Sequence, residues 1–525
     1  MSLSRRDVLR AGLLASGSLL LPRWARADES LFSTAAFPSP FLRPFVAELP
    51  IPPIPRQAAP FATMRQVPAG AVYHEIRGRA GLHRYHPDLP LTSVWGYEDV
   101  NGAGGSPITP GPTFVSREGT PMVVRFRNEL PPNHIGFGAP NMAIHRHGGE
   151  QSSEDDGYPT DLFRPGESRD YVWNEFQHFD EPRETQSLLW YHDHVVDFTS
   201  QNVYRGMAGF FLRYSDRDPG DENDPRGLRL PSAPYDIGLA FQDRRFAPDG
   251  SLVYDVFDHN GFLGDTFLVN GAINPFMRVK RRKYRFRMLC GSNARYYQMF
   301  LSTGQPFTVI GTEGGLLERP LQSPSISMAP GERYDVILDF SSYPQGAEIV
   351  MENRLEQKSG RGPDGPAAFG TPIMKFIVDG NAPDNSVIPF QLRPPFRPDP
   401  FPPTTRRIFE FGRSKGGWVV NGQLWDENRV LATPRLDDVE IWTLRNGGGG
   451  WHHPVHIHLT LSQILSRNGR PPAPIDAGMR DMVNLGPGDE VDVRVQFQKF
   501  RGRYVFHCHN VEHEDMAMMA RFDTI

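Results

Sequence analysis

Short runs in which apolar and polar residues alternate recur along most of this 525-residue chain. Alternation with a period of two is typical of strands that bury one face, because successive side chains on a strand point to opposite sides. The clearest runs are MVVRFRNEL (122–130), KYRFRMLCGS (283–292) and VEIWTLRNG (439–447). Glycine and proline, at 51 and 50 residues, exceed average usage and favour short strands joined by turns over long helices. The pattern therefore predicts an all-β protein.

A second pattern repeats in the same order as the first. FRPGESRDYVW (163–173), MAPGERYDVILDF (328–340) and LGPGDEVDVRVQF (485–497) each place Pro-Gly-acid before an alternating run. Two echoes in one order indicate three similar domains, and strands at this spacing usually form Greek-key sandwiches or barrels. The domain ranges that we predict are a proline-rich surface strap over 28–60 and β-domains over 61–215, 216–385 and 386–525.

The N-terminus has the composition of an export signal. Arg5 and Arg6 precede an apolar run over about 11–21, and Ala25-Arg26-Ala27 has the pattern of a cleavage site. We predict a twin-arginine signal peptide over 1–27 and a periplasmic or secreted protein. The apolar run is too short to span a bilayer and no later segment is long enough, so we expect no membrane span.

The charge balance bears on the partners of the protein. The chain has a formal net charge of −5, and removal of residues 1–27, with five arginines and one aspartate, would leave about −9. A chain of this charge offers no basic stripe, so we expect no nucleic-acid partner.

Histidines are concentrated in four short stretches. Ten of the seventeen lie in IHRHGG (144–149), WYHDH (190–194), HPVHIH (453–458) and HCHNVEHEDMAMM (507–519). Each stretch contains His-x-His, and on a strand such a pair faces one side about 6–7 Å apart, where it can grip a metal cluster. A lone pair of this kind is usually a surface or structural feature, whereas four pairs predict a shared site. The eight imidazoles are His145, His147, His192, His194, His456, His458, His507 and His509.

The same alternation directs Cys508 away from its two histidine neighbours, toward a different metal ion. His453 lies outside the His-x-His pair of its stretch, and His513 and Met518 can return to the cysteine through a loop. Two histidines, one cysteine and a weak axial methionine are the ligands of a blue-copper centre. A zinc site is the alternative for one cysteine near histidines, but it would leave most of the histidines unused. The other cysteine, Cys290, reads as a buried small hydrophobe.

The histidine stretches lie only in the first and third predicted domains. These two domains must therefore meet at the metal cluster. The middle domain would position them and shape the surface where a substrate binds.

These motifs together resemble the multicopper oxidases, and within them the group of bacterial spore-coat laccases and bilirubin oxidases. HRHGG, LWYHDH followed by NVYRGMAGFFL, HPVHIHL and HCHNVEHEDMAMM carry the resemblance, which covers essentially the whole mature chain. It implies three cupredoxin-like domains and four coppers per chain: one type 1, one type 2 and two type 3. The implied ligands are His453, Cys508, His513 and Met518 for type 1; His145 and His456 for type 2; His147, His192 and His509 for one type 3 copper; and His194, His458 and His507 for the other.

The resemblance implies oxidation of a small reducing substrate, one electron at a time, coupled to reduction of dioxygen to water. We expect His453 or His513 to have an edge near solvent, where the donor docks. Asp156 and Glu514 match acids that supply protons in the spore-coat group; solvated loop acids are the alternative. Arg146 departs from the family, where many relatives have tryptophan, and would place an extra cation near the cluster.

A laccase-like oxidase of phenols and aromatic amines is the leading hypothesis, and we expect a monomer. Oxidation of bilirubin, of aminophenols or of metal ions such as Cu(I) or Mn(II) is the alternative on the same fold. A non-catalytic copper-binding or scaffold protein is a further alternative, against which the intact ligand set argues.

Overall fold

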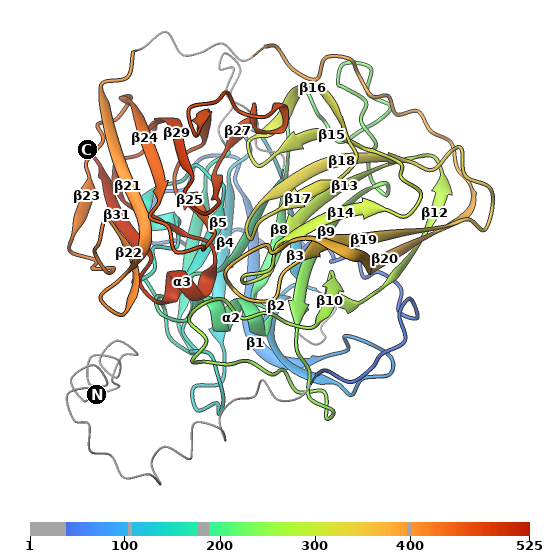
Figure 1. Ribbon diagram of the computed structural model, residues 1–525, viewed down its shortest axis with the longest axis horizontal. Coiled ribbons are helices and arrows are strands. Elements are labelled where there is room, and N and C mark those ends of the chain that lie inside the picture. The colour runs from blue at the N-terminus through green and yellow to red at the C-terminus, as the bar shows by residue number, and fades with distance from the viewer. Residues whose placement is uncertain (1–37, 103–107, 176–187, 396–401) are drawn as a thin grey trace.

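The computed structural model describes residues 38–102, 108–175, 188–395 and 402–525, so the predicted signal peptide and the first part of the strap lie outside the described residues. Strands dominate the chain and form six sheets, which confirms the predicted all-β class. Figure 1 shows the sheets as curved layers around a common centre.

The strands before residue 215 form two sheets, which enclose one hydrophobic core between them. This core includes Trp95, Phe126 and Trp173. One sheet has the order β2-β1-β4-β6 and the other β3-β8-β7-β5. The strands are β1 (Val72–His83), β2 (Thr92–Asp99), β3 (Gly111–Arg117), β4 (Met122–Glu129), β5 (Ile144–His147), β6 (Ser168–Trp173), β7 (Leu188–Asp193) and β8 (Ala208–Tyr214).

The middle two sheets enclose the second core, in which Cys290 is fully buried as predicted. Their orders are β11-β10-β9-β13-β18-β15-β16 and β12-β20-β19-β14-β17. The strands are β9 (Asp236–Arg244), β10 (Thr266–Val269), β11 (Ala272–Ile273), β12 (Phe276–Arg281), β13 (Lys283–Cys290), β14 (Tyr297–Leu301), β15 (Phe307–Thr312), β16 (Gly315–Ser323), β17 (Ile326–Met328), β18 (Arg333–Asp339), β19 (Glu348–Glu356) and β20 (Gly365–Asn381).

The last two sheets enclose the third core, which contains Cys508 and Met518. Their orders are β22-β21-β24-β29-β26-β27 and β23-β31-β30-β25-β28. The strands are β21 (Thr405–Ser414), β22 (Gly417–Val420), β23 (Val430–Ala432), β24 (Val439–Asn446), β25 (His453–Ile457), β26 (Ser462–Arg467), β27 (Met479–Arg480), β28 (Met482–Leu485), β29 (Glu490–Gln496), β30 (Gly502–Cys508) and β31 (Met519–Thr524).

Helices are short. The α-helices α2 (Thr199–Arg205) and α3 (Val511–Asp515) lie near each other, and two single 3-10 turns are η3 (Ser153–Asp155) and η4 (Pro474–Asp476). Within the described residues, no helix has both the length and the apolar character needed to cross a membrane.

The two sequence echoes form the same substructure three times. The first echo is β4, β13 and β24, and the second contains β6, β18 and β29; in each case the two strands pair antiparallel. The Pro-Gly-acid turn before the second strand holds its glycine at positive φ, at 86°, 86° and 77° for Gly166, Gly331 and Gly488. Glycine recurs there because other residues rarely adopt that conformation. The predicted repeat is confirmed, while the predicted domain boundaries stay predictions.

Strand β13 shows how the middle sheets are joined to the first pair. Phe286 and Met288 face the middle core, whereas Arg285 and Arg287 face the other side and are fully buried as well. Arg285 forms an ion pair of 2.6 Å with Asp335, and Arg287 lies over the ring of Tyr214 at the end of β8. Both faces of β13 are thus buried: ion pairs within the middle sheets satisfy its polar face, and the contact of Arg287 with Tyr214 joins that face to the first pair of sheets.

Candidate metal centre

The pairing of strands brings the eight predicted cluster histidines together. In the β5–β7 pair His145 lies opposite His192, and in the β25–β30 pair His456 lies opposite His507. The two rings of each His-x-His pair are neighbours, with centroids 4.6–5.7 Å apart. All eight side chains are essentially buried. The first and third pairs of sheets therefore meet at the histidines, as the sequence predicts.

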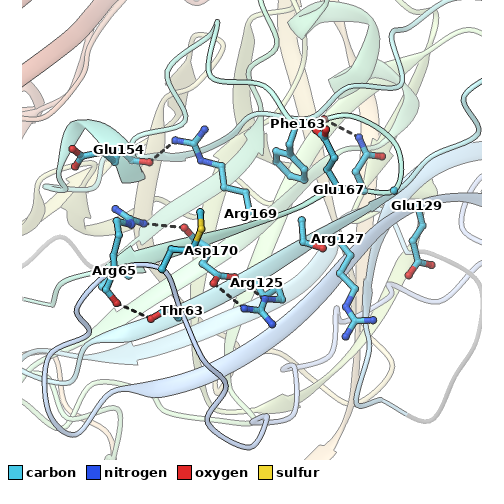
Figure 2. A pocket seen from close by; sticks show the side chains of 15 residues that line it. Thr63, Arg65, Arg125, Arg127, Glu129, Glu154, Phe163, Glu167, Arg169 and Asp170 are labelled. Atoms are coloured by element: carbon cyan, nitrogen blue, oxygen red, sulfur yellow. Dashed lines mark hydrogen bonds and ion pairs between the residues drawn. The ribbon is translucent and has the colours of Figure 1, made fainter.

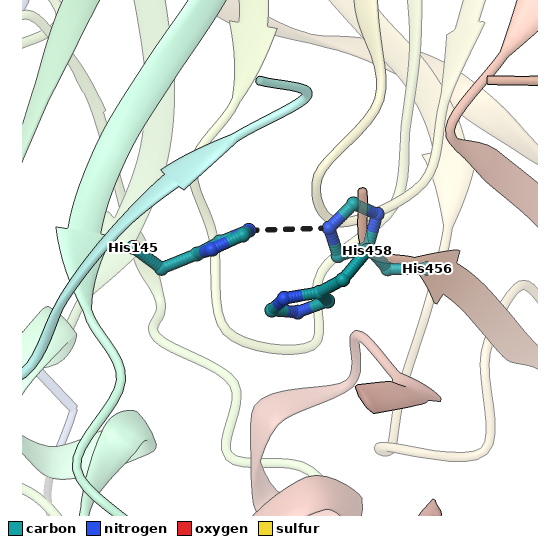
Figure 3. Close-up of side chains that lie close together, drawn as sticks. All are labelled: His145, His456 and His458. Atoms are coloured by element: carbon teal, nitrogen blue, oxygen red, sulfur yellow. Dashed lines mark hydrogen bonds between the residues drawn. The ribbon is translucent and has the colours of Figure 1, made fainter. Parts of the chain in front are cut away.

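The eight rings divide into three groups. His507 Nε2 lies 3.3 Å from His194 Nε2 and 3.1 Å from His458 Nε2. His145 Nε2 faces His456 Nε2 at 3.3 Å, as Figure 3 shows together with His458. His458 also lies with His145 and His456 in a set of mutually close ligand atoms, so the division of the rings among the coppers stays a prediction.

The third group contains the remaining rings, those of His147, His192 and His509. Their centroids lie 5.0–5.8 Å apart. The Nε2 atom of each is buried and has no hydrogen-bond partner in the described structure. A buried polar atom without a partner is costly, and these three nitrogens on neighbouring rings are available to a metal.

The opposite nitrogens of several rings are held by carbonyl oxygens. Nδ1 lies 2.7 Å from the Asp156 oxygen in His145, 3.0 Å from the Asp481 oxygen in His456 and 2.9 Å from the Asp193 oxygen in His192. A carbonyl accepts only from a protonated nitrogen, so each contact leaves the Nε2 lone pair free for a metal.

Burial keeps the cluster rings neutral, which is the form that binds metal. It lowers the pKa of His192, His456 and His458 well below the usual value, and neighbouring imidazoles lower it further. Burial is also the main cause that lowers the pKa of His194 to about 4 and that of His509 to about 3.

Asp156 and Glu514 both contact cluster histidines. Asp156 Oδ2 accepts a 2.8 Å hydrogen bond from His458 Nδ1, and its Oδ1 accepts one of 3.0 Å from Gln151 Nε2. Glu514 lies between two rings, 3.4 Å from His194 Nδ1 and 3.1 Å from His507 Nδ1. Both carboxylates are buried, so neither is a solvated loop acid.

The two acids therefore orient ligand rings, whatever else they do. Burial raises the pKa of Glu514, but the imidazoles of His507 and His194 outweigh that effect and bring it down to about 2. A carboxylate placed between two Nδ1 atoms favours a proton on each of them and so favours the orientation in which Nε2 of each ring faces the cluster.

The middle sheets also contribute to the cluster, through a contact that the sequence analysis missed. Arg333, the first residue of β18, forms a double ion pair with Asp481 at 2.6 Å for each oxygen. His147 Nδ1 lies 3.2 Å from the same guanidinium and 3.5 Å from the Asp481 carboxylate. Since Arg333 occupies the carboxylate, we regard Asp481 as a support for His147 rather than as a metal ligand. Arg333 stands inside the second echo, MAPGERYD, but nothing in that pattern points to the contact.

Arg146 adds less charge to the cluster than the sequence suggests. Its side chain lies on the opposite side of β5 from His145 and His147, over the rings of Trp173 and Phe211, and it pairs with the buried Glu175. The ion pair compensates the charge. Arg146 Nε also donates to Gln151, which in turn holds Asp156, so the residue supports an acid next to the cluster.

The second candidate centre surrounds Cys508. Its Sγ lies 3.6 Å from Nδ1 of His453 and 3.6 Å from Nδ1 of His513, and all three side chains are fully buried. Nε2 of His513 donates to the Asn260 oxygen at 3.0 Å, which fixes the ring with Nδ1 toward the sulfur. The ring of Trp418 covers the ring of His513 at 3.8 Å between centroids. No edge of His453 or His513 is itself exposed.

Three methionines compete for the axial position, and packing separates them. Met518 is fully buried in the core that contains Cys508, and its backbone oxygen accepts from Cys508 N at 3.0 Å. Met516 packs against the edge of that core and is only partly buried. Met519 belongs to a different cluster, with Tyr158 and Trp425. Of the three, Met518 is the one fully buried in the core of Cys508, and its role as the axial ligand stays a prediction.

Two cavities differ in their position relative to these centres. One cavity, of about 930 Å³, is an open groove on the first pair of sheets, where Arg65, Arg125 and Arg169 contact acids or carbonyls (Figure 2). It has no histidine or cysteine in its lining. A smaller cavity of about 430 Å³ is lined by Asn260 and Trp451, beside the ring of His513. Of these two cavities, the smaller one lies beside the cysteine centre.

Comparison with known proteins agrees with this geometry. Family models described as multicopper oxidase match residues 75–217, 252–362 and 397–525. The chain belongs to the multicopper oxidase family and is an oxidoreductase that uses dioxygen. Copper is accordingly the metal that the buried nitrogen and sulfur donors fit.

Individual members of the family are similar to this chain over most of its length. The chain is 35% identical to a bilirubin oxidase of Albifimbria verrucaria, over 96% of this chain and 85% of that protein. It is 33% identical to a laccase of Bacillus stratosphericus, over 92% and 99%. A solved laccase structure from Pediococcus acidilactici superposes with a TM-score of 0.76 at 26% identity, covering 93% of this chain and 95% of that one. The expected cupredoxin-like, laccase-related fold is confirmed.

Proposed function

We propose that this chain is a laccase-like oxidase with four coppers, which takes single electrons from a phenol or aromatic amine and reduces dioxygen to two waters. Type 1 copper would be held by His453, Cys508, His513 and Met518. Type 2 would be held by His145 and His456. The type 3 pair would be held by His147, His192 and His509, and by His194, His458 and His507.

One observation carries the proposal. Cys508 lies 3.6 Å from the nitrogens of its two histidine partners, while its sequence neighbours His507 and His509 belong to two groups of the cluster. Copper at the cysteine would accept one electron at a time and pass it on to coppers that reduce dioxygen. The backbone from His507 to His509 supplies the shortest covalent connection between the two centres.

In this proposal the protein residues bind the coppers, orient the ligand rings and deliver protons for the reduction of dioxygen. Carbonyls and carboxylates orient the rings, as described above, and the described residues of one chain supply both centres, which supports a monomer. Reduction of dioxygen consumes protons, and Asp156 and Glu514 are buried carboxylates in contact with cluster rings that could deliver them, whereas Arg333 occupies the carboxylate of Asp481. Oxidation of bilirubin, aminophenols or metal ions would use the same centres.

Replacement of Cys508 by serine tests the proposal. The unsubstituted, copper-loaded protein should be blue and contain about four coppers per chain, because a thiolate ligand gives type 1 copper its colour. Cys508→Ser should lose the colour, about one copper and all turnover, while the cluster coppers stay bound. Absorption spectra, metal analysis and oxygen uptake measure these properties. A blue Cys508→Ser protein would contradict the ligand assignment.

Substitution of the three methionines tests the axial ligand. Met518→Leu should keep the blue colour and raise the type 1 reduction potential, because loss of the weak thioether destabilises Cu(II) relative to Cu(I). Leucine nearly conserves the volume, so the unfolding free energy should change by less than about 1.5 kcal/mol. Met516→Leu and Met519→Leu are the matched controls in a redox titration. A shift of the potential in either control, and not in Met518→Leu, would move the axial role to that residue.

Substitution of the two acids tests proton delivery. Glu514→Gln and Asp156→Asn should lower turnover about a hundredfold, because they remove a proton-carrying group near the site of oxygen reduction. Reduction of the type 1 copper by donor without oxygen should stay fast, since it needs no proton from these groups. Stopped-flow measurement of the two half-reactions separates the effects.

Glu512→Gln is the control for that experiment. Glu512 is buried nearby but contacts Tyr254 and Asn293, and burial raises its pKa to about 8, so glutamine replaces a group that is neutral at pH 7. It should turn over normally. If both half-reactions slow equally in Glu514→Gln, the carboxylate has a structural role only.

We also propose export by the twin-arginine route, on the basis of Arg5, Arg6 and the apolar run that follows. Changing both arginines to lysine should leave the uncleaved precursor in the cytoplasm, because the receptor of this route distinguishes the guanidinium pair from two amines. Fractionation of cells and immunoblotting would show it. Unchanged periplasmic activity would instead assign residues 1–27 to the general secretory route.

A further inference from the structure

The cavity of about 430 Å³ beside the cysteine centre is built by two parts of the chain. The middle sheets supply the 255–263 and 358–361 segments, and the last pair of sheets supplies Arg413 and Trp451. The carbonyl oxygen of Asn260, one of the lining residues, accepts the hydrogen bond from Nε2 of His513. A molecule in this cavity would therefore be separated from a candidate copper ligand by a single residue.

Two arginines stand over the tryptophans that enclose His513. The guanidinium of Arg413 lies 5.1 Å from the ring of Trp418, and that of Arg361 lies 4.8 Å from the ring of Trp451. Both tryptophan rings contact the ring of His513, at 3.8 and 5.6 Å between centroids. Both arginines are exposed, whereas both tryptophans are buried. The guanidiniums thus form the outer layer of the wall around the centre.

These two guanidiniums have no carboxylate partner among the described residues. Arg361 donates to the Gly449 oxygen and Arg413 to the Asn260 side-chain oxygen, each at 3.3 Å. By contrast, the other two cations of the cavity are near acids: Lys358 lies 3.2 Å from Glu356, and Arg245 lies 3.8 Å from Asp265. Arg361 and Arg413 are therefore the cations of the cavity that remain able to pair with an anionic ligand.

The two acids of the cavity are engaged in their own turns. Asp255 accepts from the backbone nitrogen of Phe257 at 2.9 Å, and Asp258 accepts from that of Asn260 at 3.0 Å. The lining holds four cations and two carboxylates, and Glu356 and Asp265 next to it pair with two of the cations. The two guanidiniums that lack a carboxylate partner in the described part of the chain are therefore the groups that would attract an anionic donor.

From this arrangement we infer that the cavity is a donor site selective for aromatic molecules that carry a carboxylate or sulfonate, with Arg361 and Arg413 as its specificity-determining residues. The inference rests on the proposed oxidase function and names its substrate class. A planar guanidinium on an aromatic face is held in place and can still donate two parallel hydrogen bonds to a carboxylate. Binding the anionic group at this outer layer would place the aromatic ring of the donor against Asn260.

A matched pair of donors tests the selectivity in the copper-loaded protein. The acid is 3-(4-hydroxy-3-methoxyphenyl)propionate, and its partner is the corresponding amide. The two methylene groups insulate the phenol, so the donors differ in charge and hardly in ease of oxidation. We expect kcat/KM, measured by oxygen uptake, to be higher for the acid than for the amide. That preference should weaken as salt is added, because ions screen exposed charges.

The double variant Arg361→Gln with Arg413→Gln should lose the preference. Its kcat/KM for the acid should fall about tenfold, the effect of losing two partly exposed charge contacts, while that for the amide should change less than about twofold. The variant with lysine at both positions keeps the charge and should retain part of the preference. The control double variant, Arg226→Gln with Arg429→Gln, removes the same charge from residues outside the cavity and should behave as the unsubstituted protein.

The outcomes separate this inference from the proposed function. Equal losses for acid and amide in the double variant, or equal losses in the control variant, would overturn the selectivity while the oxidase function stands. The selectivity is also overturned if the unsubstituted protein does not prefer the acid. If the blue, copper-loaded protein consumes no oxygen with either donor, the proposed function fails, and the inference fails with it.

Discussion

The architecture of both centres depends on one constraint of strand geometry, namely that adjacent residues of a strand point to opposite faces. At the end of β30 this constraint sends Cys508 into the core of the last pair of sheets and directs the rings of His507 and His509 to the interface with the first pair. One tripeptide thereby serves two sites. A helix could not do this, because its side chains at i and i+2 point in different directions.

Burial and hydrogen bonding then decide what each ring can do. An imidazole in a buried site is neutral, since burial disfavours the charged form, and a neutral ring has one donor nitrogen and one acceptor nitrogen. The Asp156 and Asp481 carbonyls, which lie on opposite sides of the interface, take the donor nitrogens of His145 and His456. The acceptor nitrogens consequently face one another. The first pair of sheets supplies His145 with Asp156 and the last pair supplies His456 with Asp481, so this arrangement forms where the two pairs of sheets meet.

Much of the fold and most of the site could be predicted from the sequence, since both follow from periodicities. The repeated strand pairs are visible through alternation and Pro-Gly turns, and the His-x-His pairs carry their own geometry. Contacts between distant segments carry no such signal. Arg333 reaches His147 from the middle sheets, and Arg146 turns away from the cluster toward Glu175. The donor cavity could not be foreseen either, because its lining comes mainly from loops, whose paths depend on tertiary packing rather than on a local pattern.

The free acceptor nitrogens also connect stability to the metal. Three Nε2 atoms without hydrogen-bond partners, in His147, His192 and His509, are buried at the interface of the first and last pairs of sheets. Each such atom costs on the order of 1–3 kcal/mol unless a ligand or water satisfies it. An ion that binds them removes that cost only in the folded state, and its binding energy therefore adds to the stability of the fold. Since the ligands come from both pairs of sheets, the metal would also hold the two together. A metal bound by the histidines would thus serve the chemistry and also connect the first and last pairs of sheets. The Arg333–Asp481 ion pair connects the middle sheets to the same region.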